Sequence, residues 1–330
     1  MNNGKNTYII AEIGNNHNGS FKLAKKSIIA AAACGAHAVK FQSYVADEFM
    51  ANKNLQYTYK TAQGYFTENM YKMFKRIEFK NSWYLKLFKL CKKLQIDFLS
   101  SAADKISVDR LMSIRCKAIK IASEDIINYP LLEYISKRNI NIILSTGMAD
   151  EKEIKKALSI LKNNKVYLLH CVSLYPAKIE DINLGRMIAL QKFKKTIGFS
   201  DHTQEIITPS IAVSLGAKII EKHFTLSKSL KGPDHSLSLD PKEFRTMVLD
   251  IQKVEKMSFE KKIDPHEKEI KIRKRFRRSI VAKQKIQKGE KILEKMLGLK
   301  RPGTGLHPIN LKKIIGTKAK KKYLKNSQIK

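Results

Sequence analysis

Two short segments decide the fold of this chain: IGFSDHT at residues 197–203 and IIEKHFT at residues 219–225. Each begins as an apolar, strand-like run and closes on polar residues that include a histidine, His202 in the first and His223 in the second. Histidines at the ends of adjacent parallel strands can hold one divalent metal above a barrel. Glu221 and His223 are two residues apart, so they face the same side of their strand. The two segments therefore predict a catalytic mouth.

Six further strand-like runs precede these two, with helix-length stretches between them such as 22–34, 83–94 and 151–162. Strands that alternate with helices pair in parallel through crossovers, and eight such units within about 250 residues predict an α/β fold of the (β/α)8 (TIM) barrel type. A doubly wound open sheet is the alternative, but the first turn, GNNHNGS at 14–20, does not match its GxGxxG phosphate loop. The predicted strands are Tyr8–Gly14, Ala38–Gln42, Asp97–Ser101, Ala118–Ser123, Asn141–Thr146, Val166–Val172, Thr196–Asp201 and Ile219–Thr225.

The composition changes after the barrel. We expect a barrel domain at residues 1–254, then a charged linker or exposed helix at 255–278 that contains KMSFEKKIDPHEKEIKIRKRFRR. Residues 279–330 have short apolar pairs and glycine turns, which predict a small β-rich module.

The 330 residues carry 64 Lys and Arg against 30 Asp and Glu, a net charge of +34. Basic patches can capture nucleic acid or an anionic membrane surface. The lysines, however, are dispersed and are not interleaved with aromatic residues as in a base-stacking platform. A compositional drift toward lysine is the favoured explanation, and the positive field would still favour an anionic substrate.

Cysteine usage and the N-terminus indicate a cytoplasmic protein. The four cysteines form no CxxC pair, which is typical of reduced, buried thiols. The N-terminus lacks a secretory signal pattern, and the longest apolar run, Ile28–Val39, falls short of the ~18 residues that span a bilayer.

Polar residues recur at the end of strand after strand. Singly, a strand lysine can extend to the surface and a strand-end serine can cap the next helix. Together they predict one mouth, where two lysines and several hydroxyls suit a ligand with phosphate and carboxylate groups. The residues are Glu12, Lys40, Ser101, Lys120, Ser123, Ser145, His170, Ser200, Asp201, His202, Glu221 and His223.

For the two strand-end histidines, a hydrogen-bonded core imidazole is the alternative to a metal ligand. Two neutral imidazoles with waters make a plausible site for Mn²⁺, Mg²⁺ or Zn²⁺. We expect Asp201 to orient His202 or to cap the next helix rather than to ligate the metal. His170, His17 and His235 are weaker candidates.

An ordered set of motifs covers nearly the whole chain: IIAEIGNNHNG, AVKFQ, KIASED, INYP, ILSTGM, LLHCVSLYP, IGFSDHT, EKHFT, GPDHSLSLDP and KRPGTG. Assembled in this order, they resemble the N-acetylneuraminate (sialic acid) synthase family, which includes legionaminate and pseudaminate synthases and ends in an antifreeze-like (SAF) module. The resemblance implies condensation of phosphoenolpyruvate with an N-acylated amino-sugar aldehyde and water, giving a nine-carbon 2-keto acid and phosphate. The implied sugar is N-acetylmannosamine or a close relative, with a 6-deoxy diacetamido sugar as the alternative.

The resemblance also implies residue roles. His202 and His223 would bind the metal, Mn²⁺ first with Mg²⁺ or Co²⁺ as alternatives, and Glu12 would act near the attacking water. The implied substrate ligands fall into three sets: Lys40 with Ser101 for the phosphoenolpyruvate carboxylate; Lys120, Ser123, Ser145 and Ser200 for its phosphate; and Gln42, Asp125, Tyr175 and Asp234 for the sugar. Arg301 would reach the N-acyl group from the partner subunit of a domain-swapped homodimer.

The chain departs from the family pattern at two sugar-side positions. Asp125 stands where the family has a glutamate, directly after Glu124, and Ser173 stands where neuraminate synthases often have asparagine. Two rival functions stay open at this point. One is a related condensing barrel that uses a sugar phosphate, and the other is a basic protein that binds nucleic acid or an anionic surface.

Overall fold

The structure is a computed structural model that describes residues 6–257 and 263–330. The chain divides into two compact units, Met1–Ser258 and Phe259–Lys330. Each unit has a hydrophobic core of its own.

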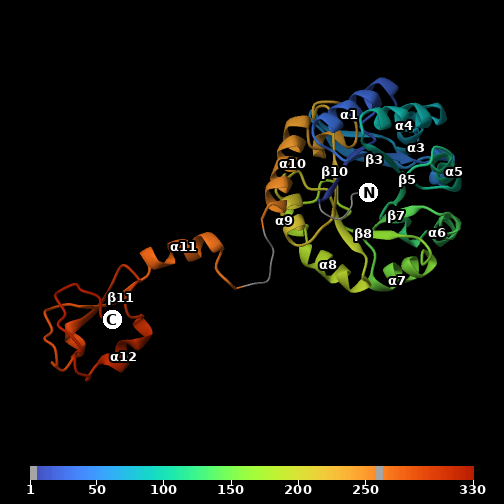
Figure 1. The fold of residues 1–330 in the computed structure, drawn as a ribbon. Helices are drawn as coiled ribbons and strands as arrows, with labels where there is room; N and C mark the ends of the chain where they lie inside the picture. The colour runs from blue at the N-terminus through green and yellow to red at the C-terminus, as the bar shows by residue number, and fades with distance from the viewer. Residues whose placement is uncertain (1–5, 258–262) are drawn as a thin grey trace. The chain divides into compact units, whose positions relative to one another are not determined.

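The first unit is a closed barrel of parallel strands, which confirms the predicted (β/α)8 fold (Figure 1). Around the barrel the order is β1-β10-β9-β8-β7-β6-β5-β2. The predicted bounds of β1 and β9 match the structure, and the other strands end within one or two residues of the predicted positions. The barrel strands are β1 (Tyr8–Gly14), β2 (Ala38–Ser43), β5 (Asp97–Ala102), β6 (Ala118–Ile121), β7 (Asn141–Ser145), β8 (Val166–Cys171), β9 (Thr196–Asp201) and β10 (Ile219–His223).

Helices cover the outside of the barrel (Figure 1). Capping boxes fix two of the helix starts: Asp150 and Asp240 each accept a backbone N–H, while Glu153 and Glu243 bond back to the capping residue. The covering helices are α1 (Phe21–Ala33), α4 (Tyr84–Lys93), α5 (Lys105–Ser113), α6 (Tyr129–Ser136), α7 (Glu151–Ile160), α8 (Leu184–Ala189), α9 (Thr208–Ser214) and α10 (Pro241–Glu255).

The barrel strands are packed closely enough that one position requires glycine. A Cβ added at Gly198 in β9 would lie 2.5 Å from the carbonyl oxygen of Ile219 and 2.5 Å from Cδ2 of Leu169. Because the Ile219 carbonyl belongs to the backbone of β10 and cannot yield without disturbing the sheet, glycine lets β9 lie against that strand.

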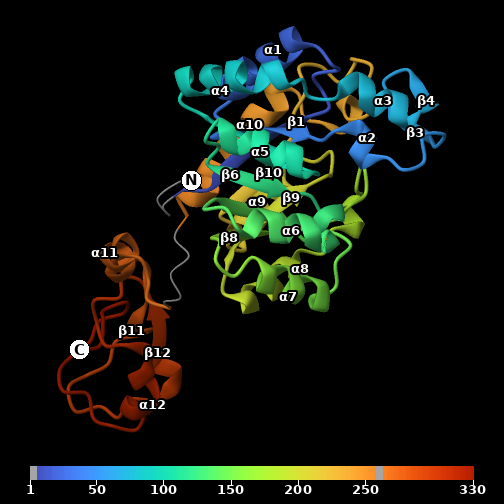
Figure 2. The same cartoon turned by 90° about the vertical axis from the view of Figure 1, so that its right-hand side faces the viewer.

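The connection from β2 to β5 holds elements that the sequence did not predict. It contains α2 (Ala46–Phe49), an antiparallel hairpin of β3 (Gln56–Thr61) and β4 (Gly64–Asn69), and α3 (Met70–Ile77). Figure 2 shows this hairpin beside α3 at one edge of the barrel. A small aromatic and aliphatic cluster packs beneath it, separate from the main core.

The second unit is the predicted small β-rich module. Strands β11 (Ser279–Ala282) and β12 (Leu297–Lys300) pair antiparallel, and three isolated bridges add further pairing. Its core contains Ile280, Ile286, Met296 and Tyr323, with the short helix α12 (Leu311–Ile314) packed at the edge.

The predicted linker at 255–278 contains one exposed helix. Helix α10 runs to Glu255, and α11 (Glu267–Phe276) is exposed at every residue. Residues 258–262 of that prediction lie outside the described residues. In the part of the chain that the structure describes, no helix is both long and apolar enough to cross a bilayer.

Candidate active site

The carboxyl ends of the barrel strands enclose one cavity of about 340 Å³. Every barrel residue to which the family resemblance assigned a role lines it. Parallel strands in a closed barrel bring their carboxyl ends to the same face, so residues far apart in sequence converge there. The lining includes Glu12, Lys40, Gln42, Ser101, Lys120, Ser123, Asp125, Ser145, Tyr175, Ser200, His202, His223 and Asp234.

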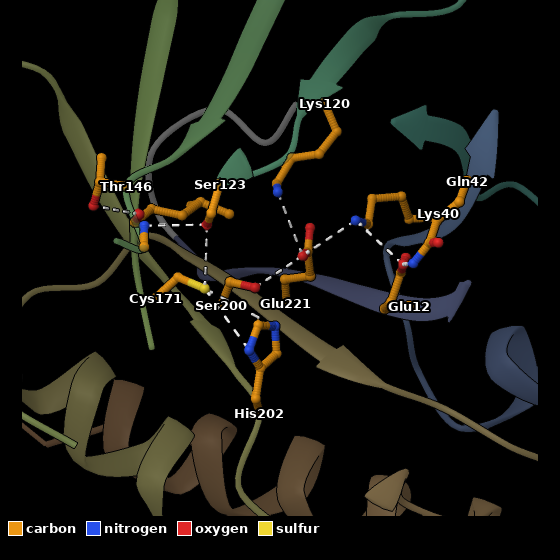
Figure 3. A network of polar contacts seen from close by, with 12 residues as sticks. Glu12, Lys40, Gln42, Lys120, Ser123, Thr146, Cys171, Ser200, His202 and Glu221 are labelled. Atoms are coloured by element: carbon orange, nitrogen blue, oxygen red, sulfur yellow. Dashed lines mark hydrogen bonds and ion pairs between the residues drawn. The ribbon is translucent and has the colours of Figure 1, made fainter. Parts of the chain in front are cut away.

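Two lysines and two glutamates form a buried charged quartet at the centre of the mouth (Figure 3). The ammonium of Lys40 lies 3.3 Å from Oε1 of Glu12 and 3.3 Å from Oε1 of Glu221. Lys120 approaches the same oxygen of Glu221 at 3.7 Å. The four side chains come from β2, β1, β10 and β6, and all are nearly inaccessible to solvent. Their formal charges cancel, which lowers the cost of burying them.

The quartet gives its two carboxyls different acidities. Burial raises the pKa of Glu12 to about 7, against the opposing effect of Lys40. Burial alone would also raise the pKa of Glu221, but Lys120, Lys40 and the Ser200 hydroxyl together lower it. Since Glu12 Oε2 has no hydrogen-bond partner, Glu12 can accept or release a proton near neutral pH.

Hydroxyl groups surround the lysines on one side of the cavity. Ser200 donates to Oε1 of Glu221 at 2.9 Å, and the backbone N–H of Gly147 donates to Ser123 Oγ at 3.1 Å. The hydroxyl of Ser145 is buried without a partner, as is that of Ser173. Buried polar groups are normally satisfied, so these hydroxyls indicate where a polar ligand or water binds.

The two histidines lie side by side, with ring centroids 5.5 Å apart. Nδ1 of His202 lies 2.7 Å from the carbonyl oxygen of Val172 and can donate its proton to it. In that tautomer Nε2 has no contact except the thiol of Cys171 at 3.9 Å. Nδ1 of His223 is buried and has no partner. A ring nitrogen held by a backbone carbonyl, with the other free, is typical of a metal-binding histidine.

The histidine pair fits a divalent metal with an incomplete protein shell. Burial lowers the pKa of His223, so its ring stays neutral and able to ligate. Burial would also lower the pKa of His202, but Cys171 and the Val172 carbonyl raise it, so a metal would compete with a proton there. Among residues 6–257 and 263–330, no group of three or more His, Cys, Asp or Glu has a metal-binding arrangement. The other coordination positions of the metal would therefore be filled by substrate oxygens or water.

The predicted sugar ligands occupy other parts of the same cavity. Tyr175 stacks on the ring of His202 with centroids 4.2 Å apart, and Gln42 donates to Oε1 of Glu12 at 3.1 Å. Burial raises the pKa of both Asp125 and Asp234 to about 6. Carboxyls that titrate near neutrality can accept or donate hydrogen bonds to hydroxyls.

The structure adds residues that the sequence-based set lacked. Glu221 was predicted at the mouth without a role, and the structure places it in the quartet. Cys171 ends β8 beside His202 and was predicted only as a buried thiol. A third group comes from the connection between β2 and β5, where no motif marked it: Tyr44, Phe49, Tyr57 and Phe74.

Other predicted candidates lie elsewhere. None of His17, His170 and His235 lines the cavity. Arg301 belongs to the second unit, and its contact with the N-acyl group stays a prediction. Asp201 does not cap α9, whose N-cap is Ile207; it accepts instead from the N–H of Thr203.

Buried lysines, carboxylates, hydroxyls and histidines gather at the strand ends of this closed barrel. Such an arrangement is typical of the active site of an enzyme that handles an anionic substrate. The NeuB family model matches residues 27–262, and the SAF domain model matches residues 277–330. The chain belongs to the NeuB family, which confirms the predicted membership among the sialic acid synthases.

Similar proteins span nearly the whole chain. An N,N'-diacetyllegionaminic acid synthase of Legionella pneumophila is 40% identical, over 94% of this chain and 90% of that protein. A pseudaminic acid synthase of Helicobacter pylori is 37% identical, over 95% and 93%. The crystal structure of an N-acetylneuraminic acid synthetase from Leptospira borgpetersenii, in complex with citrate, is similar with a TM-score of 0.73 at 35% identity, over 81% of this chain and 90% of that one.

The quartet generates a prediction about stability. Lys40→Met keeps the side-chain length but leaves two buried carboxylates with one lysine, so we expect the free energy of unfolding near pH 8 to fall by about 3–5 kcal/mol. The loss should be smaller near about pH 5.5, because Glu12, with its pKa of about 7, is then protonated in the folded state and carries no charge to desolvate. Urea unfolding at both pH values measures this difference.

Lys53→Met is the control, since it breaks an exposed pair with Asp47. It should leave the free energy of unfolding nearly unchanged at either pH. An equal loss for Lys40→Met at both pH values would contradict the assignment of Glu12 as the carboxyl that titrates.

Proposed function

We propose that this protein condenses phosphoenolpyruvate with an N-acylated amino-sugar aldehyde and water, releasing phosphate and a nine-carbon 2-keto sugar acid. The observation that carries the proposal is the lysine-rich, hydroxyl-lined cavity that also holds the histidine pair. Membership in the NeuB family supports it. The sugar is N-acetylmannosamine or a 6-deoxy diacetamido relative, and the names of the two relatives add weight to the second.

Phosphoenolpyruvate would bind through its two anionic ends. Lys40, helped by Ser101, would meet the carboxylate. A second set would hold the phosphate: Lys120, Ser123, Ser145 and Ser200. Lysines supply charge and hydroxyls supply directed donors, so together they orient the substrate while compensating its charge.

The reaction forms one C–C and one C–O single bond and breaks the bond from C2 to the phosphate oxygen. The electrons of the C2=C3 double bond of phosphoenolpyruvate form the bond from C3 to the aldehyde carbon, and the aldehyde oxygen becomes a hydroxyl. Water then bonds to C2, which becomes a carbonyl as phosphate leaves, and the two protons of the water end on the new hydroxyl and on phosphate. Glu12 would take the proton from the water, a role for which its pKa of about 7 is suited. A divalent metal bound by His202 and His223, Mn²⁺ first with Mg²⁺ or Co²⁺ as alternatives, would supply Lewis-acid polarisation of the aldehyde.

The sugar would be positioned by groups around the rest of the cavity, namely Gln42, Tyr175, Asp125 and Asp234. We propose further that the protein acts in the cytoplasm as a homodimer. In that dimer Arg301, from the SAF domain of the partner subunit, would reach the N-acyl group.

A phosphate-release assay tests the proposed reaction. We expect phosphate release that requires phosphoenolpyruvate, a divalent metal and an N-acylated amino sugar together. Mass analysis of the product over several hexosamines would identify the sugar. No turnover with any amino-sugar aldehyde would reject the proposal.

The two rivals predict different outcomes. Faster turnover of a phosphorylated sugar would favour the sugar-phosphate synthase. Salt-sensitive micromolar binding to unrelated oligonucleotides without any turnover would favour the nucleic-acid binder.

The metal assignment predicts the effect of His223→Ala. Loss of a residue that only supports a metal ligand already lowers metal affinity or activity by about 10–100-fold. Loss of a ligand itself should therefore reduce metal-dependent turnover by more than about a hundredfold. Circular dichroism should show an unchanged fold. His266→Ala, which removes the exposed imidazole that caps the start of α11, serves as the control and should keep full turnover. Full activity in His223→Ala would overturn the assignment.

A further inference from the structure

A second ion pair lies directly behind the histidines and plays no part in the cavity. Asp201 precedes His202 in the chain, and Lys222 precedes His223. Successive residues of a strand point to opposite faces, so side chains next to the inward-facing histidines point outward from the barrel. Neither Asp201 nor Lys222 lines the cavity, and both side chains have 0% exposure.

The ammonium of Lys222 is held by three oxygens. It lies 2.6 Å from Oδ2 of Asp201, 2.6 Å from the carbonyl oxygen of Thr203 and 3.2 Å from the Thr203 hydroxyl. Asp201 accepts in turn from the N–H of Thr203 at 2.9 Å and from the hydroxyl of Thr208, the first residue of α9, at 2.6 Å. The network therefore joins β9, the loop after it, α9 and β10.

The pair stands where regular strand pairing ends. In the β9–β10 ladder the last partners are Asp201 and Lys222. His202 lies one residue beyond β9, and His223 is the last residue of β10. By bonding to the Asp201 carboxylate and to the Thr203 carbonyl, Lys222 holds the residue on each side of His202. The same lysine is covalently next to His223, so one side chain ties the positions of the two histidines together.

Stability alone does not account for a charged pair at this place. Replacing a buried ion pair by uncharged side chains of similar volume is often neutral or stabilising, whereas removing one partner is strongly destabilising. Asp201 and Lys222 therefore contribute little net stability as a pair, but they constrain geometry. What they constrain is the distance between two imidazoles.

We infer that the Asp201–Lys222 ion pair is a positioning device that fixes His202 and His223 at the spacing required to share one divalent metal. The inference rests on the proposed function in taking these two histidines as the ligands. It assigns the pair no contact with substrate. Its loss should weaken metal binding and leave phosphoenolpyruvate binding intact, because the lysines and hydroxyls of the anion site lie on other strands or face the cavity.

The test measures Mn²⁺ binding by electron paramagnetic resonance in the full chain without substrates. Three variants are compared with the wild type: Lys222→Met, Asp201→Asn and the double variant. We expect each to weaken Mn²⁺ affinity by about 10–100-fold, the range seen for residues that support metal ligands. The dissociation constant for phosphoenolpyruvate, measured without metal, should change less than about twofold, because the groups of the anion site lie on other strands or face the cavity.

The double variant separates positioning from stability, since it leaves no unpaired charge in the core. It should unfold at a denaturant concentration near that of the wild type and still bind Mn²⁺ weakly. It also keeps the test valid if Lys222→Met does not fold. A folded double variant with wild-type Mn²⁺ affinity would overturn the inference.

Lys228→Met/Glu243→Gln is the matched control, because it makes the same kind of change in a half-exposed pair at 2.7 Å. It should leave Mn²⁺ affinity unchanged, and an equal weakening there would also overturn the inference. If the wild type itself binds no Mn²⁺, the histidine assignment and this inference fail together. The phosphate-release assay then decides the proposed reaction separately.

Discussion

The burial of two lysines against two glutamates is the constraint on which the site depends. Any one of these charges would cost several kcal/mol to bury alone. Barrel closure brings the ends of four strands to one point, and it buries together the four charged side chains that they carry: Lys40, Lys120, Glu12 and Glu221. Burial raises the pKa of Glu12 to about 7, so it is the carboxyl of the quartet that can change its charge near neutral pH, as its proposed role in proton transfer requires.

Two ionic networks thus meet at β10 and lie on its opposite faces. Glu221 and His223 line the cavity, while Lys222 bonds to Asp201, which accepts from Thr208 of α9. In the proposed function the inner network meets an anionic substrate, whereas the charged groups of the outer one bond only to the protein. Strand alternation separates these tasks, since adjacent residues cannot share a face.

The sequence was sufficient to predict the barrel because its strands are buried on both faces and read as largely apolar runs, as in β1 and β8. It was also sufficient for most of the mouth, since strand ends converge in a barrel. It did not reveal the β3–β4 hairpin, whose strands are largely exposed and rich in polar residues. Nor could it predict that Lys222 pairs with Asp201, because such contacts depend on strand register, which local sequence does not specify.

In the proposed function the lysines of the quartet recognise the anionic groups of phosphoenolpyruvate. Calorimetric titration of phosphoenolpyruvate into the wild type and into Lys120→Met, without sugar, tests it most directly. A charge-assisted contact is worth about 1.5–3 kcal/mol, so the variant should bind at least about tenfold more weakly. An unchanged dissociation constant in a folded Lys120→Met protein would contradict the account.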